Sequence, residues 1–269
     1  MNYKMIALDL DGTLTNSEKK ISPRTKDALM KAQEQGVKLV LASGRPLYGI
    51  MPLALELQLK EHDGYILAYN GGKIIECRTG TVIFQNSLTQ DRSRMVIRAA
   101  ECAGTDILSY DEEWIVTNNR FSPYAVEESR INRLELKQID DLSGWVHGLV
   151  PKFILLGHPD DLAVKEPFVK RWLGQDFSIY RSAGFFLEVM PRGIDKARSL
   201  EQLLRQLKLR PESLVACGDG YNDLSMIDYA GLGVVMANGV DSLKEHADFI
   251  TDSNDEDGIA RVVEQFILQ

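Results

Sequence analysis

Two aspartates follow directly on a short apolar run near the start of the chain. Asp9 and Asp11 come after residues 5–8, which are typical of a buried strand. The catalytic and ligand-binding groups of α/β enzymes lie where such strands end. Gly12 permits a sharp turn that would bring both carboxylates and the Thr13 hydroxyl around one small volume. Crowded carboxylates repel each other, so the motif indicates either a divalent cation or a shared proton between them.

Two other structures could use the same residues. Asp and Gly are ordinary turn residues, so an Asp-rich turn without chemistry is the simplest alternative. An EF-hand loop is excluded, because it would require a carboxylate or amide at Thr13, a glycine at Leu14 and a glutamate at Lys20.

Polar residues at three further turns could complete a site for phosphoryl transfer. Ser43 offers a hydroxyl beside the backbone N–H groups of a helix start, where anions bind. Lys196 offers a mobile positive charge near another helix start. Asp219 and Asp223 add carboxylates after the apolar run 214–217. Such hard oxygen ligands select magnesium over zinc or copper.

Each of these residues also has an ordinary structural role. Ser43 could cap a helix, Lys196 could be a solvated surface lysine, and Asp223 could interact with a helix macrodipole. Their joint occurrence in this order favours a phosphoryl-transfer site over these separate structural roles. A competing P-loop is excluded, because no G-x-x-x-x-G-K-[ST] motif occurs in the chain.

Composition limits the class of protein. The 269 residues suffice for a substantial core and make two domains plausible. A formal net charge of −8 argues against a general nucleic-acid binder, which would show a basic face. A few local cations could still bind a small anionic substrate.

Cysteine usage and the N-terminal residues bear on the compartment. Cys77, Cys102 and Cys217 form no C-x-x-C pair and no ligand cluster with histidines, which fits a reduced, cytoplasmic setting. The N-terminus does not have the pattern of a signal peptide, and no uncharged apolar run approaches the ~20 residues that a membrane span needs. We therefore expect a cytoplasmic protein without a membrane anchor.

Apolar runs and amphipathic helices alternate at both ends of the chain. This alternation predicts a parallel sheet with helices on both faces. The expected strands are 5–8, 37–42, 64–69, 214–217 and 232–236, and the expected helices include 23–35, 196–207 and 259–268.

The middle of the chain has a different texture. It contains alternating stretches, more arginine, and the three tryptophans Trp114, Trp145 and Trp172. We interpret this part as an inserted α+β domain. The predicted division is a core of residues 1–83 and 186–269 with an insert of residues 84–185.

These motifs together resemble the haloacid dehalogenase superfamily of phosphatases, in particular its Cof-like, sugar-phosphatase branch. The similarity covers essentially the whole chain. It implies an α/β fold with a Rossmann-like, doubly wound parallel core and an inserted cap domain. One departure is Ala197, where a glycine is expected after the lysine. The four family motifs match Asp9-Leu10-Asp11-Gly12-Thr13, Ser43-Gly44-Arg45, Lys196 and Gly218-Asp219-Gly220-Tyr221-Asn222-Asp223.

The resemblance also implies a role for each matched residue. Asp9 would be the nucleophile and Asp11 the general acid and base. Magnesium would be held by Asp9, the backbone carbonyl of Asp11 and Asp219, with Asp223 orienting metal-bound water. The phosphoryl oxygens would be held by Ser43, Gly44, Lys196 and Asn222. Arg45 and Asn70 are further candidates that could equally brace the core or the cap.

Two rival functions share this chemistry. A phosphomutase would return the phosphoryl group to a sugar instead of to water. A phosphoacceptor signalling module would combine the same residue types on a doubly wound sheet, but such modules are far shorter and have no cap.

The expected partner is a small phosphorylated metabolite. Its identity and the oligomeric state are left open, and aromatic residues of the insert such as Tyr110, Trp114, Tyr124, Phe185 and Phe186 could be either core or substrate contacts.

Overall fold

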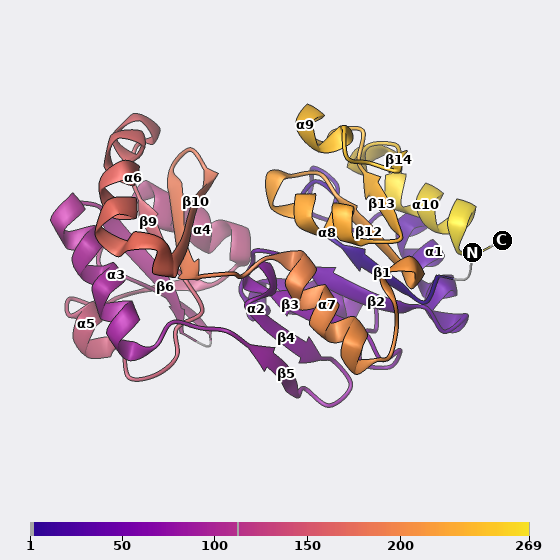
Figure 1. The fold of residues 1–269 in the computed structure, drawn as a ribbon, viewed down its shortest axis with the longest axis horizontal. Helices are drawn as coiled ribbons and strands as arrows, with labels where there is room; N and C mark the ends of the chain where they lie inside the picture. The colour runs from indigo at the N-terminus through magenta and orange to yellow at the C-terminus, as the bar shows by residue number, and fades with distance from the viewer. Residues whose placement is uncertain (1–2, 112, 269) are drawn as a thin grey trace. The chain divides into compact units, whose positions relative to one another are not determined.

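The computed structural model describes residues 3–111 and 113–268 and divides the chain into two compact units. The first, here called the core unit, comprises Met1–Gln85 and Asp195–Gln269. The second, the insert unit, comprises Asn86–Ile194. Figure 1 shows the two units joined by two chain crossings, and each unit is described separately below.

The core unit is built on an eight-stranded sheet in the order β14-β13-β12-β1-β2-β3-β4-β5. Strands β14 to β3 are parallel, and β4 and β5 extend the sheet as antiparallel strands. The strands are β1 (Met5–Leu8), β2 (Lys38–Ala42), β3 (Tyr65–Ala68), β4 (Lys73–Glu76), β5 (Val82–Gln85), β12 (Leu214–Gly218), β13 (Leu232–Val235) and β14 (Phe249–Ile250).

Helices cover both faces of this sheet. Strand residues Met5 and Ala7 pack with Leu200 and Met226 of α7 and α8, whereas α1 and α10 contact one another (Figure 1). The alternate strand residues Ile6 and Leu8 are also fully buried, as a sheet covered on both sides requires. The helices are α1 (Pro23–Glu34), α2 (Leu47–Glu56), α7 (Lys196–Gln206), α8 (Leu224–Tyr229), α9 (Asp241–Lys244) and α10 (Gly258–Phe266), with short 3-10 turns at Tyr69–Gly71, Pro211–Ser213, Tyr221–Asp223 and Asn254–Glu256.

The predicted α/β class and doubly wound core are confirmed, and local sequence signals explain much of the agreement. The Ser22 side chain caps α1 by accepting from the Thr25 N–H, and Pro23 occupies the first helical position. The β4–β5 hairpin was not predicted, because its strands are half exposed and lack a continuous apolar run.

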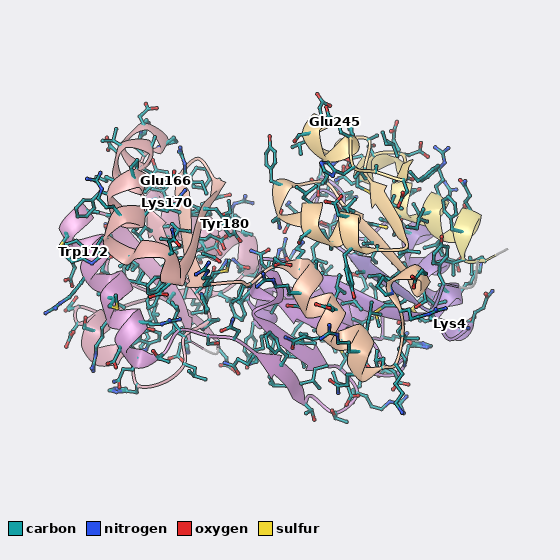
Figure 2. The ribbon with its side chains drawn as sticks, viewed as in Figure 1. Lys4, Glu166, Lys170, Trp172, Tyr180 and Glu245 are labelled. Carbon is teal, nitrogen blue, oxygen red and sulfur yellow. The ribbon has the colours of Figure 1, made fainter. Side chains whose placement is uncertain are left out.

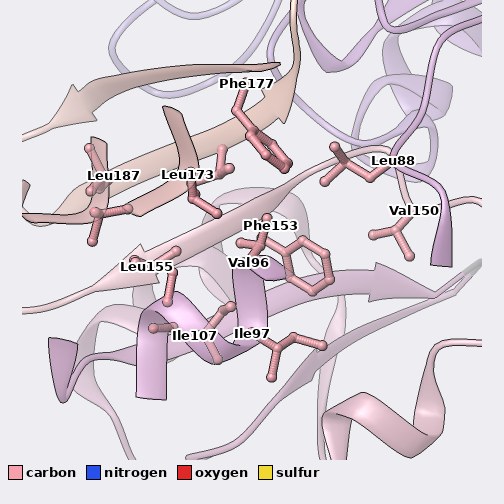
Figure 3. Close-up of a cluster of buried hydrophobic side chains, with 14 of the residues drawn as sticks. Leu88, Val96, Ile97, Ile107, Val150, Phe153, Leu155, Leu173, Phe177 and Leu187 are labelled. Carbon is pink, nitrogen blue, oxygen red and sulfur yellow. The ribbon is translucent and has the colours of Figure 1, made fainter. Parts of the chain in front are cut away.

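The insert unit contains a six-stranded sheet in the order β10-β11-β9-β6-β7-β8. Among the strand pairs that the described residues form in this sheet, only β7–β8 is parallel. An apolar cluster around Phe153 fills the space between this sheet and its helices, as Figure 3 shows. The elements are α3 (Gln90–Ala103), β6 (Asp106–Asp111), β7 (Trp114–Thr117), α4 (Pro123–Asn132), β8 (Glu135–Gln138), α5 (Leu142–Trp145), β9 (Phe153–Leu156), α6 (Pro159–Leu173), a 3-10 turn at Gly174–Asp176, β10 (Phe177–Ala183) and β11 (Phe186–Pro191).

The unit boundaries differ from those expected from the sequence. The first lies after Gln85 instead of after residue 83, and the second after Ile194 instead of after residue 185. The second difference has a clear cause, since Phe186–Pro191 forms β11 and pairs with β9 and β10 of the insert sheet. Its sequence is apolar except for Glu188 and resembles a core strand, so sequence pattern alone assigns it to the wrong unit.

The surface of the insert unit carries paired charges along α6. Figure 2 shows Glu166 and Lys170 near each other on this helix, and their charged atoms are 2.6 Å apart. Glu166 also pairs with Arg181 at 3.0 Å. Within the part of the chain that the structure describes, no helix is both long and apolar enough to cross a membrane.

Candidate active site

The first two aspartates lie where the central strand β1 ends. Asp9 follows Leu8, and its backbone N–H donates to the Cys217 carbonyl of the neighbouring strand β12. Gly12 has φ +87°, and a Cβ atom there would lie 2.4 Å from Oδ2 of Asp219. Glycine is therefore required both by the backbone conformation and by the close approach of the two loops.

Three carboxylates of the core unit converge at this edge. Asp9, Asp219 and Asp223 each offer an oxygen, and these oxygens lie within 4.8 Å of one another. The register of the strands explains this, since Leu8 of β1 is paired with Cys217 of β12 and the aspartates follow both strands. Asp9 and Asp223 are buried, and Asp219 is half-buried.

Lys196, the first residue of α7, neutralises part of this charge. Its Nζ donates to Oδ1 of Asp9 and to Oδ1 of Asp223, both at 2.6 Å. The side chain is fully buried. Lys196 is therefore a fixed charge, and the sequence-based expectations of a mobile charge or a solvated surface lysine were wrong.

The loop after β12 is held together by Asp223. Its Oδ2 accepts the backbone N–H groups of Asp219 and Gly220 at 3.0 and 2.9 Å. Oδ1 of Asp219 in turn accepts the Thr13 hydroxyl at 2.8 Å. The two acidic loops are thus connected directly, and Thr13, whose hydroxyl the sequence placed near the carboxylates without assigning it a role, fixes the orientation of Asp219.

Burial and mutual repulsion alter the acidity of the cluster. Burial and the nearby Asp223 carboxylate raise the pKa of Asp9 to about 8, although Lys196 opposes the shift. Burial also raises the pKa of Asp219 to about 6, against the hydrogen bond from Thr13. Burial disfavours the charge of Lys196, but Asp223 and Asp9 outweigh it and raise the lysine pKa. The single positive charge of Lys196 therefore does not balance the three carboxylates of the cluster.

Asp11 points to a different set of partners. Oδ2 accepts Nε of Arg45 at 2.7 Å, and Oδ1 accepts Nη2 of Arg45 at 2.5 Å and Nζ of Lys19 at 2.7 Å. Burial raises the pKa of Asp11, but Arg45 and Lys19 together outweigh it and hold the pKa below its usual value. Arg45 therefore contacts a catalytic candidate instead of standing open for phosphate.

Ser43 and Asn222 are linked through Asn70. Ser43 follows β2, and its buried backbone carbonyl accepts the Asn70 N–H at 2.9 Å. The Asn222 side-chain amide donates to Oδ1 of Asn70 at 3.2 Å. Gly44 faces the same asparagine, since a Cβ added there would lie 3.2 Å from its amide. Asn70 thus connects the predicted phosphate-binding loops.

The donor set fits a magnesium ion. Three carboxylates are balanced by a single buried lysine, and magnesium binds through one or two carboxylates with additional oxygen ligands. Both oxygens of Asp223 already accept protein hydrogen bonds, which leaves Asp9 and Asp219 as the main side-chain donors. The Asp11 carboxylate lies outside the cluster, so Asp11 can contribute only through its backbone.

The sequence missed one residue near the site and gave no firm role to another. Lys19 lies eight residues beyond Asp11 in a loop with no motif of its own, and only its contact with Asp11 identifies it. Asn70 was a weaker candidate, and its signal is the Asn70-Gly71-Gly72 turn at the end of β3. Both Tyr69 and Asn70 have positive φ there, a conformation that is rare for residues with side chains.

This fold and site belong to a known family. Residues 6–263 match the haloacid dehalogenase-like hydrolases, and the chain is a member of that family. A crystal structure of a haloacid dehalogenase-like hydrolase from Bacteroides thetaiotaomicron superposes with a TM-score of 0.94 at 44% identity, covering 98% of this chain and 99% of the other.

Curated relatives define the class of enzyme. The Bacillus subtilis protein named "Putative phosphatase YxeH" is 33% identical over 269 residues, 99% of each chain. The 5-amino-6-(5-phospho-D-ribitylamino)uracil phosphatase YcsE of the same organism is 30% identical over 268 residues, 100% of this chain and 97% of the relative. The chain is accordingly a phosphatase of the haloacid dehalogenase type.

Proposed function

We propose that the protein hydrolyses phosphate monoesters of small metabolites, sugar phosphates among them, through an aspartyl-phosphate at Asp9 and with magnesium as cofactor. The observation that supports this most strongly is the convergence of Asp9, Asp219 and Asp223 around the buried ammonium of Lys196. Such a site places fixed positive charge beside a nucleophile, as phosphoryl transfer requires.

In the first half of the reaction, a carboxylate oxygen of Asp9 attacks phosphorus. A phosphorus–oxygen bond forms, the bond from phosphorus to the ester oxygen breaks, and the departing oxygen takes a proton from Asp11. Arg45 and Lys19 favour the ionised form of Asp11. The negative charge of a bound phosphate beside Asp11 acts in the opposite direction and favours its protonation.

In the second half, water attacks the phosphorus of the aspartyl-phosphate. Asp11, now ionised, accepts a proton from this water, the bond from phosphorus to Asp9 breaks, and inorganic phosphate is released. The low pKa of Asp11 suits this step, because its carboxylate persists until the water arrives. Ser43 and Asn222 would bind the phosphoryl oxygens, and Lys196 would offset negative charge next to the nucleophile.

A bound magnesium ion would add Lewis-acid stabilisation of the charge on the phosphoryl oxygens. Asp9, Asp219 and the backbone carbonyl of Asp11 would hold it. Asp223 is already fixed by Lys196 and two backbone N–H groups, which suits a role in orienting the water around the ion.

The proposed substrate class is supported by the chemistry of a relative. The name of YcsE specifies a primary phosphate ester on a ribityl chain, that is, a phosphorylated polyol on a small metabolite. The chain covers nearly the whole of that relative, so a substrate of similar size and functional groups is the proposal for this protein. The three cysteines are unpaired, which supports a reducing compartment such as the cytoplasm.

The test is direct trapping of the intermediate. The protein is mixed with magnesium and a labelled phosphate monoester chosen by a phosphate-release screen of phosphorylated metabolites, quenched in acid and treated with hydroxylamine, which cleaves acyl phosphates. We expect label on the wild-type protein that hydroxylamine removes, and none on Asp9→Asn.

The matched control is Asp27→Asn, because Asp27 lies on α1 and its exposed side chain pairs with Lys31 at the surface. This variant should label like the wild type. Phosphate release by Asp9→Asn at the wild-type rate would refute the assignment of the nucleophile. Transfer of the label to a second sugar instead of to water would identify a mutase.

A further inference from the structure

The guanidinium of Arg45 is committed to a carboxylate and to a backbone carbonyl. Nε and Nη2 donate to the two oxygens of Asp11, while Nη1 donates to the Gly49 carbonyl of α2 at 3.2 Å. Its side chain is only 12% exposed. A bidentate guanidinium fixes both the position and the plane of the carboxylate that it binds.

Lys19 approaches the same carboxylate from a loop whose shape is closely specified. Oδ1 of Asn16 accepts the backbone N–H groups of Glu18 and Lys20, and the Asn16 carbonyl accepts that of Lys19. Lys19 itself adopts φ +60°. This turn directs the Lys19 ammonium to Asp11, at 2.7 Å, while the adjacent Lys20 pairs with the exposed Glu18.

The loop is also anchored to the rest of the core unit. The Ser17 N–H and hydroxyl donate to Asp255 at 2.8 and 2.6 Å, and Asn254 donates to the Thr15 carbonyl at 2.9 Å. The position of Lys19 is therefore determined by contacts with residues more than 200 positions away. A surface lysine with no role would not need such a support.

We propose that Arg45 and Lys19 are positioning residues that hold the Asp11 carboxyl group against the ester oxygen of the substrate, and that Arg45 does not serve as a phosphate ligand. This inference rests on the proposed function. It assigns Arg45 and Lys19 to proton transfer. Sequence reasoning gave Arg45 to phosphate binding and did not identify Lys19.

The consequence is a dependence on the leaving group. When the bond from phosphorus to the ester oxygen breaks, an alkoxide needs the proton of Asp11, whereas a nitrophenolate is stable without it. Loss of a phosphate ligand would instead slow both esters equally. Benzyl phosphate and p-nitrophenyl phosphate are similar in size and differ strongly in this respect, so they form the test pair.

The experiment measures kcat/KM with saturating magnesium for Arg45→Lys and Lys19→Met, because kcat/KM includes only the steps through the first phosphoryl transfer. Arg45→Lys keeps the charge but loses the bidentate fork, and Lys19→Met keeps the length but loses the charge. The controls are Arg24→Lys, which alters a bidentate pair with Glu264, and Lys20→Met in the same loop.

For Arg45→Lys we expect benzyl phosphate hydrolysis to fall by about 10- to 100-fold and p-nitrophenyl phosphate hydrolysis by less than about threefold, since general acid catalysis contributes about 10²- to 10⁴-fold. Lys19→Met should show the same selectivity with a loss of about tenfold. Inhibition by inorganic phosphate should be unchanged, and both controls should match the wild type.

Equal losses on both esters, or weaker inhibition by inorganic phosphate, would overturn the inference while leaving the proposed function intact. Failure of the wild type to release phosphate from these esters and from every compound of the metabolite screen would instead refute the proposed function. Circular dichroism verifies folding. If Arg45→Lys does not fold, Lys19→Met decides the result, because its side chain is half exposed and outside the buried core.

Discussion

The core unit and the insert unit both bury a lysine beside carboxylates. In the core unit, Lys196 lies 2.6 Å from both Asp9 and Asp223 at the end of the parallel strands. In the insert unit, Lys152 lies 3.1 Å from Glu188 and 5.6 Å from the centre of the Tyr110 ring, immediately before β9 of a mainly antiparallel sheet. Both lysines are almost completely inaccessible to solvent.

The surroundings of the two lysines differ in how the neighbouring acids are arranged. In the insert unit, Oε1 of Glu128 accepts from both the Tyr110 hydroxyl and the Asn132 amide, and Oε2 of Glu188 accepts from Lys152. In the core unit, none of the hydrogen bonds made by the described residues reaches Oδ2 of Asp9 or Oδ2 of Asp219. Among the described residues, three carboxylates converge on one point only in the core unit, and this convergence, not burial of charge alone, marks the candidate active site.

The largest expected effect comes from replacing the two lysines in turn. Lys196→Met removes the fixed charge beside the nucleophile, so kcat/KM should fall by about 10²- to 10³-fold or more, as for loss of one electrostatic donor. Lys152→Met should leave kcat/KM near the wild-type value but lower the free energy of unfolding by about 3–5 kcal/mol, because Glu188 loses its buried partner.

Steady-state kinetics and urea unfolding of both variants check this comparison. An equal loss of activity for Lys152→Met in folded protein would show that the insert lysine takes part in the reaction. A fully active Lys196→Met would mean that the core cluster is structural.

The second prediction concerns the open acceptors of the core unit. Asp219→Asn should raise the magnesium concentration for half-maximal activity by at least about 10- to 100-fold, and Thr13→Val should produce a smaller increase through the loss of its 2.8 Å hydrogen bond. Magnesium titrations of phosphate release measure both. The same requirement in Asp219→Asn and the wild type would exclude Asp219 as a ligand.

The third prediction concerns pH and the same cluster. The pKa of Asp9 is raised to about 8 and that of Asp219 to about 6, so the folded, metal-free protein holds protons that the unfolded chain releases. It therefore loses stability as pH rises from the ordinary aspartate range toward 8. Magnesium binds the ionised groups, so the increase in Tm at one fixed, subsaturating magnesium concentration should be larger at pH 8 than at pH 6.

Differential scanning fluorimetry with and without magnesium measures this difference. In Asp9→Asn the side chain at position 9 no longer titrates, so much of the pH dependence should disappear. An increase in Tm that is larger at pH 6 would contradict the assignment of Asp9 as a metal ligand.

The contrast between the units also shows how far sequence reasoning reaches. Asp9, Asp219 and Asp223 could be placed because strand ends of a parallel sheet meet at one edge, and each follows an apolar run or turn that marks such an end. The burial of Lys196 and the pairing of Arg45 with Asp11 could not, because side-chain direction depends on tertiary packing. Lys152 and Glu188 gave no signal, since they lie in the insert without a motif.

The smallest expected effect concerns Glu128, a buried acid of the insert unit. Burial raises the pKa of Glu128, while the hydroxyl of Tyr110 favours its ionised form by donating to Oε1. Tyr110→Phe should therefore lower the free energy of unfolding by about 1.5–3 kcal/mol at pH values above the raised pKa of Glu128, where the hydroxyl is bonded to a charged carboxylate. The loss should shrink as pH falls through the raised pKa of Glu128, since the protonated acid depends less on that donor.

Tyr124→Phe is the matched control, because Tyr124 stacks on Phe185 through its ring. Urea unfolding at pH 8 and pH 5 measures the difference, and kcat/KM should match that of the wild type at both values. A stability loss that grows toward pH 5 would mean that Tyr110 stabilises the neutral acid, and a large loss of activity would transfer this cluster from the structure of the insert to the reaction.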